Sequence, residues 1–430
     1  MLSVEIVEKI LKQELVYATG CTEPCAISYC ASVAASEIKK LGDSVDRIEV
    51  YASKNILKNA MSAGLPKTKK VGVNYAAGIG ALHGNPENKL NVNNDIDEET
   101  YVLVSKMIDE KKITVDVSDK PNVLYIDITV YGKNHKARAI IADEHTRIIS
   151  IDVDGKNIFK DGGNHKSDKL TPDEIASYLT IKNIYEFCTQ ENYYPIEMVR
   201  RSEEVNKAIS DAGLVGDYGL GVGKMLKKDI DSGKRANNSI NKAIMYATAG
   251  SDARMVGAPY PVVTNSGSGN QGITITMPVI SVARDLGVSD EIKYRALTMA
   301  HLCSIRIKSK FGPLSAFCGA AIASTGAACG IAYLYGGDYD VLVRTISNMF
   351  GTVTGMMCDG AKPDCSLKIY AGLQAAFEAV YLALDRKRVE ANEGIVCQDV
   401  EDTIDNVCDL SKNCSDQIDT KILHYMLNKK

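Results

Sequence analysis

Apolar residues recur every three or four positions over residues 4–16, which predicts an amphipathic helix with Ser3 as its N-terminal cap. The apolar positions of this repeat are Val4, Val7, Ile10, Leu11 and Leu15. A second helix is predicted to begin near Thr22, which can cap it, and to end just before Gly42. Pro24 suits the first turn of that helix. The chain therefore begins with two helices, and the pattern leaves open which later part of the chain they pack on.

After residue 44 the apolar period changes to two, as in strands that bury one face. The strand-like stretches are 48–50, 113–117, 126–130, 137–142 and 147–153. Asp154 and Gly155, which follow the last of them, are typical turn residues. We interpret 44–156 as an α+β region with an antiparallel sheet, interrupted by helix around 54–83.

Residues 157–170 are polar and contain Gly162 and Gly163, which predicts a linker. Thr171 and Glu174 then form a capping box, with Pro172 at the first helical position. Helical patterns dominate from there to the end of the chain. The predicted fold class is α+β, with a mixed N-terminal α+β domain followed by a large all-helical domain. The predicted domains are N-terminal helices carrying Cys21 (1–43), a sheet domain (44–165) and a helical domain (171–430).

The uncharged stretch 312–337 is long enough to cross a bilayer, but it consists mainly of Ala, Gly, Ser, Cys and Thr. We therefore interpret it as a buried helix or helix pair and expect no membrane partner. The start of the chain lacks a signal-peptide pattern, so a cytoplasmic location is expected. A net charge of -4, a pI near 6.0 and the lack of a basic stripe argue against a nucleic-acid partner.

Twelve cysteines in a chain of this size are expected to be mostly reduced thiols. We interpret six of them as core or surface thiols without a role in chemistry: Cys188, Cys303, Cys329, Cys397, Cys408 and Cys414. Cys318, Cys358 and Cys365 differ, because Cys358 and Cys365 lie seven positions apart in a segment rich in Gly, Asp and Pro and Cys318 directly precedes Gly319. Three thiolate ligands leave one metal position open, as in sites that carry out substrate chemistry. Zinc and an iron–sulfur centre both suit this ligand set.

Cys21 lies at the predicted start of the second helix, where unpaired N–H groups and the helix dipole favour a thiolate. It is therefore a candidate base or nucleophile, and the alternative is a buried thiol at a helix start. Cys25 is a second thiol one helical turn later. A redox pair of Cys21 and Cys25 is a further alternative.

The segment 265–272, Asn-Ser-Gly-Ser-Gly-Asn-Gln-Gly, exposes many N–H groups and small hydroxyls and can hold a carboxylate or a phosphate. The alternative is a flexible turn. The segment 265–272 resembles the phosphate-binding loop of pyridoxal-phosphate dehydratases only superficially, because those enzymes need a Schiff-base lysine shortly upstream. The similar pattern Ser53-Lys54-Asn55 lies about two hundred residues earlier, so we expect no pyridoxal phosphate.

Five motifs taken together resemble the iron–sulfur L-cysteine desulfidases, which are relatives of the L-serine dehydratase alpha chain. They are Cys-Thr-Glu-Pro at 21–24, Gly-Asn-Pro at 84–86, Ser-Gly-Ser-Gly-Asn-Gln-Gly at 266–272, Phe-Cys-Gly-Ala-Ala at 317–321 and Cys-Asp-Gly-Ala-Lys-Pro-Asp-Cys at 358–365. The resemblance covers nearly the whole chain. It differs from the serine dehydratases in the shorter gap between Cys358 and Cys365 and in a C-terminus without a cysteine. Both differences favour the desulfidase branch.

The resemblance implies an oxygen-labile [4Fe–4S] cluster held by Cys318, Cys358 and Cys365, with the fourth iron free to bind substrate, and Cys21 as the catalytic base. It implies a carbon–sulfur lyase that converts L-cysteine to sulfide, ammonia and pyruvate, and it favours a homodimer. The segment 266–270 would bind the substrate carboxylate through Ser266, Gly267, Ser268, Gly269 and Asn270. Four cations are further candidates for substrate contact: Arg254, Arg306, Lys308 and Lys310. An iron–sulfur L-serine dehydratase and a non-enzymatic metal-binding or redox-sensing protein remain the alternatives.

Overall fold

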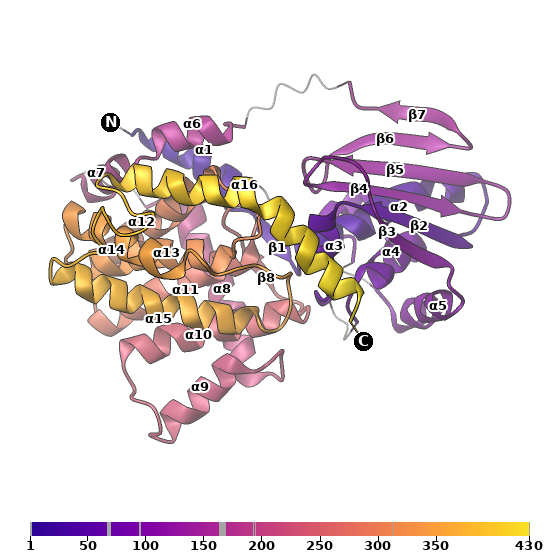
Figure 1. Ribbon diagram of the computed structural model, residues 1–430. Helices are drawn as coiled ribbons and strands as arrows, with labels where there is room; N and C mark the ends of the chain where they lie inside the picture. Colours follow the sequence, from indigo (N-terminus) through magenta and orange to yellow (C-terminus); the bar gives the residue numbers. More distant parts are fainter. Residues whose placement is uncertain are drawn as a thin grey trace.

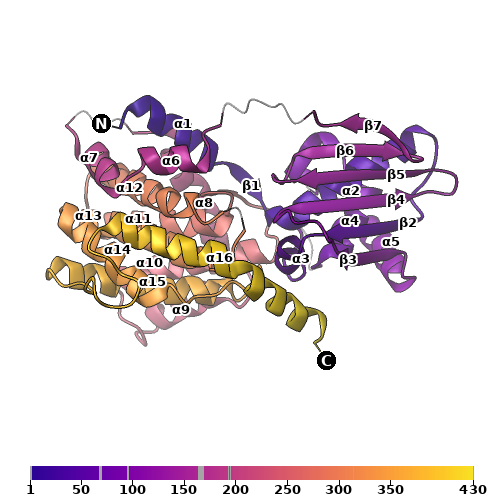
Figure 2. The ribbon, with the colours of Figure 1, turned by 45° about the horizontal axis from the view of Figure 1, so that its top comes forward.

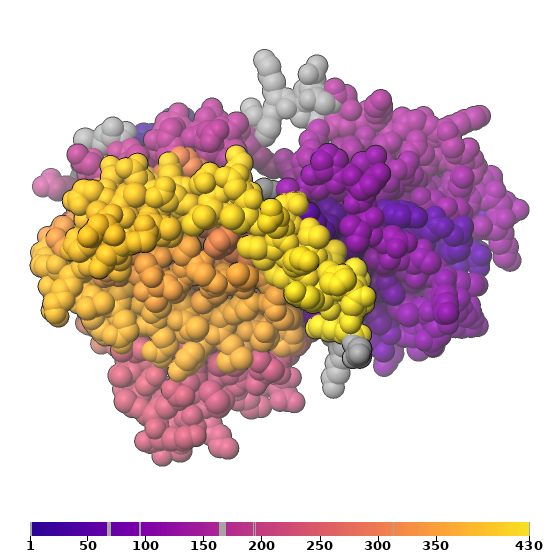
Figure 3. All heavy atoms as spheres, viewed as in Figure 1, coloured from indigo at the N-terminus to yellow at the C-terminus, as the bar shows by residue number. Residues whose placement is uncertain are grey.

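The computed structural model describes residues 2–66, 70–93, 96–162, 169–191, 193, 195–312 and 314–429. A sheet part and a helical part lie side by side, and the N-terminus lies on the helical part (Figure 1). The C-terminal helix α16 (Val400–Leu427) runs from the helical part onto the sheet part, as the space-filling view also shows (Figure 3). This architecture confirms the α+β class predicted from the sequence.

Six strands of the described residues form one sheet in the order β3-β2-β4-β5-β6-β7. Their bounds are β2 (Arg47–Ala52), β3 (Ile113–Val117), β4 (Tyr125–Tyr131), β5 (Lys136–Ala142), β6 (Ile148–Val153) and β7 (Lys156–Lys160). Strands β2 and β3 are parallel, and every other pair in this sheet is antiparallel. Every strand predicted by alternation is present.

The edge hairpin corrects one prediction. Asp154 and Gly155 form the predicted turn, and both have positive φ, 50° and 81°, as a tight two-residue hairpin turn requires. However, the chain continues from this turn as strand β7 instead of becoming a linker at residue 157. Alternation fails to reveal β7 because it is an exposed edge strand whose residues all face water. Of the predicted linker, 163–168 lie outside the described residues.

Helices cover one face of the sheet (Figure 2). They are α2 (Thr22–Lys40), α3 (Lys54–Ala60), α4 (Val73–Leu82) and α5 (Glu98–Asp109), with the short 3-10 helix η1 (Pro86–Asn91). The helix predicted around 54–83 is thus two helices, and α5 was not predicted. Helix α2 packs on β4, β5 and α4. A Cβ at Gly80 of α4 would lie 2.1 Å from the Ser28 carbonyl oxygen, so glycine is what permits this close packing.

Helix α1 (Val4–Glu14) packs instead on the helical part, and Ser3 caps it as predicted. Between α1 and α2, strand β1 (Tyr17–Thr19) pairs antiparallel with β8 (Pro261–Val263). This two-stranded sheet brings the segment before Cys21 beside the segment before Ser266. The N-terminal cap of α2 is Cys21, whereas the sequence had indicated Thr22. The Thr22 hydroxyl donates to the Glu23 carboxylate, and Gly42 follows the end of the helix with φ +77°.

The helical part contains the remaining helices. They are α6 (Pro172–Tyr178), α7 (Ile181–Thr189), α8 (Glu197–Val215), α9 (Val222–Asp231), α10 (Ser239–Met255), α11 (Gly269–Leu286), α12 (Asp290–Ser309), α13 (Gly319–Leu334), α14 (Tyr339–Val353) and α15 (Cys365–Leu384). Thr171 and Glu174 make the predicted capping box at the start of α6.

Helix α13 is the buried helix predicted within 312–337. It packs against α11, α12, α14 and α15. Cβ atoms at Gly326 and Gly330 would lie 2.6 and 2.7 Å from carbonyl oxygens of α12, so small residues set this helix spacing. Within the described chain, α15 alone has the length and apolar composition that could cross a membrane. Leu373, Phe377 and Val380 of that helix are fully buried in the helical core.

Candidate active site

Four of the described helices begin at one small cavity of about 130 Å³. Cys21 precedes α2, Ser268 precedes α11, Cys318 precedes α13, and Cys365 is the first residue of α15. The first N–H groups of a helix have no partner within the helix, and its N-terminus carries a partial positive charge. Four such ends around one cavity therefore favour anionic groups, whether thiolates or a bound carboxylate.

Backbone pairing brings Cys318 and Cys358 together. The Cys318 N–H donates to the Met356 carbonyl (2.8 Å), and the Cys358 N–H donates to the Ala316 carbonyl (2.7 Å). The two thiols contact each other through a hydrogen bond. Cys365 lines the same cavity from the start of α15. The structure thus places all three sequence-predicted thiols around one space.

The lysine side chains beside Cys358 help to make it a thiolate. Its pKa is lowered to about 6 by the hydrogen bond with Cys318 and then by Lys58, the Gly360 N–H and Lys368, against the opposing effect of burial. Burial raises the pKa of Cys365 to about 11, and the contact with Cys358 together with burial raises that of Cys318. Before a cation binds, one thiolate is thus favoured, and further deprotonation needs the positive charge of a metal.

Lys58 of α3, in the sheet part, contacts both α16 and the segment around Cys358 in the helical part. Its ammonium is buried, pairs with the buried Asp419 carboxylate of α16 and donates to the Cys358 carbonyl (3.2 Å). A Cβ at Gly360, where φ is +103°, would lie 2.4 Å from the Lys58 carbonyl oxygen. Lys54, the lysine of the Ser-Lys-Asn pattern, pairs with the Asp416 carboxylate and donates to the Thr420 hydroxyl (3.0 Å), both on α16.

Cys21 lines the cavity and is 2% exposed. Burial raises its pKa, Arg254 lowers it and Glu23 raises it. The expected lowering at the helix start is therefore corrected, because loss of hydration outweighs the nearby positive charges. The Cys25 thiol points instead to the Thr19 carbonyl (3.7 Å). Burial raises the Cys25 pKa to about 12.

The segment 265–270 forms a turn that places the start of α11 at the cavity. Gly267, Ser268 and Asn270 line the cavity, and the Ser268 hydroxyl accepts from the Gln271 N–H (3.4 Å). The Ser266 hydroxyl instead donates to the Asn265 amide oxygen. Gly269 packs against Arg254, whose Nε would lie 2.3 Å from a Cβ at this position.

Arg254, at the end of α10, contacts both the segment before α2 and the start of α11. Its Nη2 donates to the Gly20 carbonyl (2.9 Å), and its Nη1 donates to the Asn270 amide oxygen (3.3 Å). The side chain is 5% exposed, and within the described ranges no carboxylate lies within 4 Å of it. Of the other three candidate cations, Arg306 and Lys310 pair with Asp405, and Lys308 donates to the Gly312 carbonyl.

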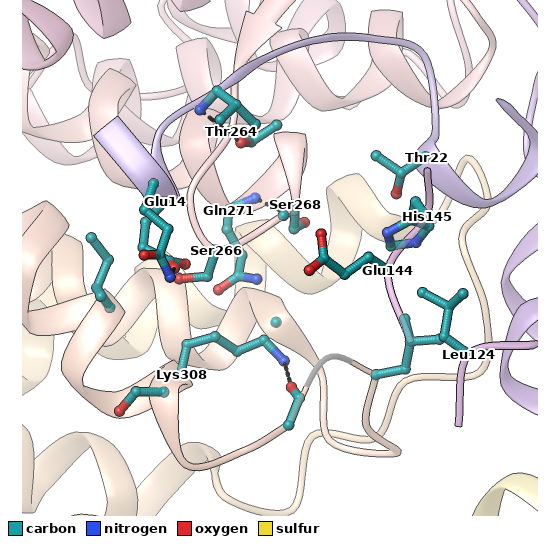
Figure 4. A pocket seen from close by; sticks show the side chains of 18 of the residues that line it. Glu14, Thr22, Leu124, Glu144, His145, Thr264, Ser266, Ser268, Gln271 and Lys308 are labelled. Atoms are coloured by element: carbon teal, nitrogen blue, oxygen red, sulfur yellow. Dashed lines mark hydrogen bonds between the residues drawn. The ribbon is translucent and has the colours of Figure 1, made fainter. Parts of the chain in front are cut away.

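The small cavity adjoins a larger one of about 740 Å³ between the sheet part and the helical part. Figure 4 shows Glu144 and His145 entering this larger cavity from the sheet side, opposite Ser268 and Gln271 of the helical part. The two cavities share eight lining residues: Thr22, Glu23, Asn59, Gly267, Ser268, Gln271, Gly319 and Cys358. The larger cavity therefore provides a route from the interdomain surface to Cys21 and the three thiols.

His301 of α12 hydrogen-bonds to the turn before α11. Its Nδ1 and carbonyl oxygen contact the Asn265 amide (3.1 and 3.3 Å), and its Nε2 contacts the Ser202 hydroxyl (3.2 Å). The ring is fully buried, and burial lowers its pKa to about 3. The histidine is therefore neutral in the folded protein.

His301 predicts acid sensitivity of folding. An unfolded histidine binds a proton below about pH 6.5, whereas the folded one stays neutral to about pH 3, so stability falls as pH falls through this window. Between pH 7 and pH 5 the expected loss from this group is about 2 kcal/mol. Urea unfolding of the wild type and His301→Gln at both pH values tests this, and an equal loss in both proteins would contradict it.

Comparison with known proteins decides the family. Residues 87–424 match the serine dehydratase alpha chain family. The chain belongs to this family. It is 40% identical over 421 residues to a UPF0597 protein of Oleidesulfovibrio alaskensis, covering 98% of this chain and 97% of the relative. UPF0597 proteins of Clostridium perfringens (39% over 427 residues, 99% of each chain) and Porphyromonas gingivalis (38% over 428 residues, 98% of each chain) are similar.

Membership of the serine dehydratase alpha chain family confirms the predicted relationship and supports a dehydratase-like lyase of an iron–sulfur family. The matched region includes Arg254, the turn before α11 and the three thiols, whereas Cys21 and Glu23 precede it. The full-length relatives cover both segments.

Proposed function

We propose that the protein eliminates sulfide from L-cysteine and releases pyruvate and ammonia. The observation that carries this proposal is one cavity lined by Cys21, by the start of α11 and by the three thiols Cys318, Cys358 and Cys365. The family description favours L-serine as the alternative substrate, because loss of water and loss of sulfide follow similar chemistry.

The three thiols suit a [4Fe–4S] cluster. Within the described part of the chain, no three His, Cys, Asp or Glu side chains converge on a single metal ion. A cluster instead offers a separate iron to each thiolate, so its ligands are spread around it. The starts of α13 and α15, with Lys58 and Lys368, supply the positive surroundings that thiolates need. When bound, the cluster supplies a Lewis acid at its open position.

The protein's own groups handle the rest of the substrate. Cys21, as a thiolate, removes the Cα proton, and Arg254 is the nearby cation that lowers its pKa. The free N–H groups at the start of α11, with Ser268 and Asn270, hold the carboxylate. The Cα–H electrons form the new double bond as the Cβ–S bond breaks. The resulting aminoacrylate leaves as its imine, and water converts that to pyruvate and ammonia.

Turnover by anaerobically reconstituted protein tests this function. We expect pyruvate from L-cysteine, faster than from L-serine, and loss of both activities when an iron chelator removes the metal. Faster turnover of L-serine would assign the protein to the dehydratases. Turnover of neither amino acid by protein that holds iron would contradict an enzymatic function.

A further inference from the structure

The cavity beside Cys21 contains a buried cation whose charge is not balanced by any carboxylate of the described residues. Arg254 is 5% exposed, and its Nε makes no hydrogen bond to any of the described groups. Its other nitrogens donate to neutral partners, the Gly20 carbonyl and the Asn270 amide oxygen. A buried charge is costly unless an opposite charge meets it, so this arrangement suits an anion that binds from the cavity.

A buried carboxylate, Glu23, lines the same cavity and likewise has no partner of opposite charge among the described residues. Glu23 is 9% exposed and, within the part of the chain that the structure describes, accepts from two neutral donors, the Thr22 hydroxyl (3.0 Å) and the Asn59 amide (3.1 Å). Across the described ranges, no Lys, Arg or His nitrogen lies within 4 Å of its carboxylate, although Arg254 lines the same space. The two opposite charges are thus held apart instead of forming a salt bridge.

Cys21 lies under the influence of both charges, because Arg254 and Glu23 act on its thiol in opposite directions. We infer that the cavity binds the substrate as a zwitterion, with Arg254 pairing with the α-carboxylate and Glu23 with the α-ammonium. An α-amino acid carries these two groups on one carbon, so the two contacts together would present Cα to Cys21. The inference rests on the proposed function for the reaction, but the binding it describes needs no turnover.

Two charge contacts define the ligand class. Free α-amino acids with a small side chain satisfy both contacts. In a peptide or an N-acylated amino acid, no single carbon carries both a free ammonium and a free carboxylate, so at least one of the two charges is left unpaired, which costs affinity. Amines without a carboxylate leave Arg254 unpaired in the same way. We therefore expect discrimination by charge at two separate positions.

Three probes that cannot undergo elimination test this inference on the anaerobic, iron-loaded protein. They are L-alanine, propanoate, which lacks the ammonium, and ethylamine, which lacks the carboxylate. Ligand-observed NMR titration is expected to show that the wild type binds L-alanine at least about tenfold more tightly than either other probe. Equal affinity for L-alanine and propanoate would overturn the role of Glu23, and this arm needs no variant.

Charge-removing variants then assign each contact. Glu23→Gln is expected to weaken L-alanine about tenfold or more and to leave propanoate unchanged, whereas Arg254→Gln weakens L-alanine and leaves ethylamine unchanged. Glu37→Gln on α2 and Arg284→Gln on α11 make the same charge changes away from the cavity and should alter none of the affinities. Arg254→Lys keeps the charge and should retain part of the L-alanine affinity. Unchanged L-alanine binding in both Gln variants would overturn the inference.

These results separate the inference from the proposed function. Charge-specific binding of L-alanine without turnover of L-cysteine or L-serine would support the zwitterion site and contradict the elimination reaction. Turnover of L-cysteine or L-serine, together with an L-alanine affinity that neither Glu23→Gln nor Arg254→Gln changes, would support the reaction and overturn the zwitterion site.

Discussion

Replacement of Cys358 by alanine is expected to remove bound iron and to lower turnover at least about 100-fold, because a lost ligand should exceed the 10- to 100-fold cost of a lost outer contact. Among the three thiols, Cys358 has the lowered pKa, because the hydrogen bond with Cys318 and then Lys58, the Gly360 N–H and Lys368 favour its thiolate. Its loss leaves Cys318 and Cys365, and burial still raises the pKa of both remaining thiols. Iron and acid-labile sulfide per chain, measured after anaerobic reconstitution, report the binding directly.

Matched cysteine variants make this measurement specific. Cys329 is buried within α13, the helix that Cys318 caps, and Cys414 is exposed on α16. Cys329→Ala and Cys414→Ala should keep the full iron content, so a loss confined to Cys318, Cys358 and Cys365 variants would identify the ligands. Full iron content in Cys358→Ala would show that the cluster assignment is wrong.

Local patterns predicted much of the sheet part. Alternation located strands such as β2, in which buried residues alternate with more exposed ones, because a strand with one buried face requires a period of two. It failed for β7, which faces water on both sides. It also failed for the three-residue strands β1 and β8, which are too short to show any period. Yet pairing of β1 with β8 is what brings Cys21 beside the start of α11.

The chemistry of the site was predictable only where it shows as a local sequence pattern. Cysteine spacing and the glycine-serine segment are local signals, and the structure places Cys21, Ser268 and the three thiols around one cavity. The roles of Glu23 and Asn59 carry no local signal. Glu23 stands out only because, among the described residues, its buried carboxylate accepts from Asn59 of α3 and meets no cation, an arrangement that arises only when α2, α3 and the helical part meet. Arg254 is similarly distinguished from Arg306 only by its lack, in the described structure, of an acidic partner.

Replacement of Cys21 by serine is expected to lower turnover about 10²- to 10⁴-fold while leaving the iron content unchanged, because a positioned general base contributes about this much. A serine hydroxyl is a far weaker acid than a thiol, so it supplies almost no anion to accept the Cα proton. In the wild type, burial raises the pKa of Cys21 above its usual value. The active form is the thiolate, so kcat/KM should rise with pH through the neutral and alkaline range.

A readout independent of sulfide release isolates the proton transfer. L-Alanine has no leaving group, so exchange of its Cα proton for deuterium in heavy water would report the base alone. We expect exchange with wild-type protein, loss of exchange in Cys21→Ser, and retention in Cys25→Ser, whose thiol lies in the same helix but points to the Thr19 carbonyl. Loss of exchange in Cys25→Ser with retention in Cys21→Ser would transfer the role of base to Cys25. Both thiols are buried and they lie four residues apart, so damage to α2 should affect the two variants alike. The difference between the two residues is that Cys21 lines the cavity and Cys25 does not.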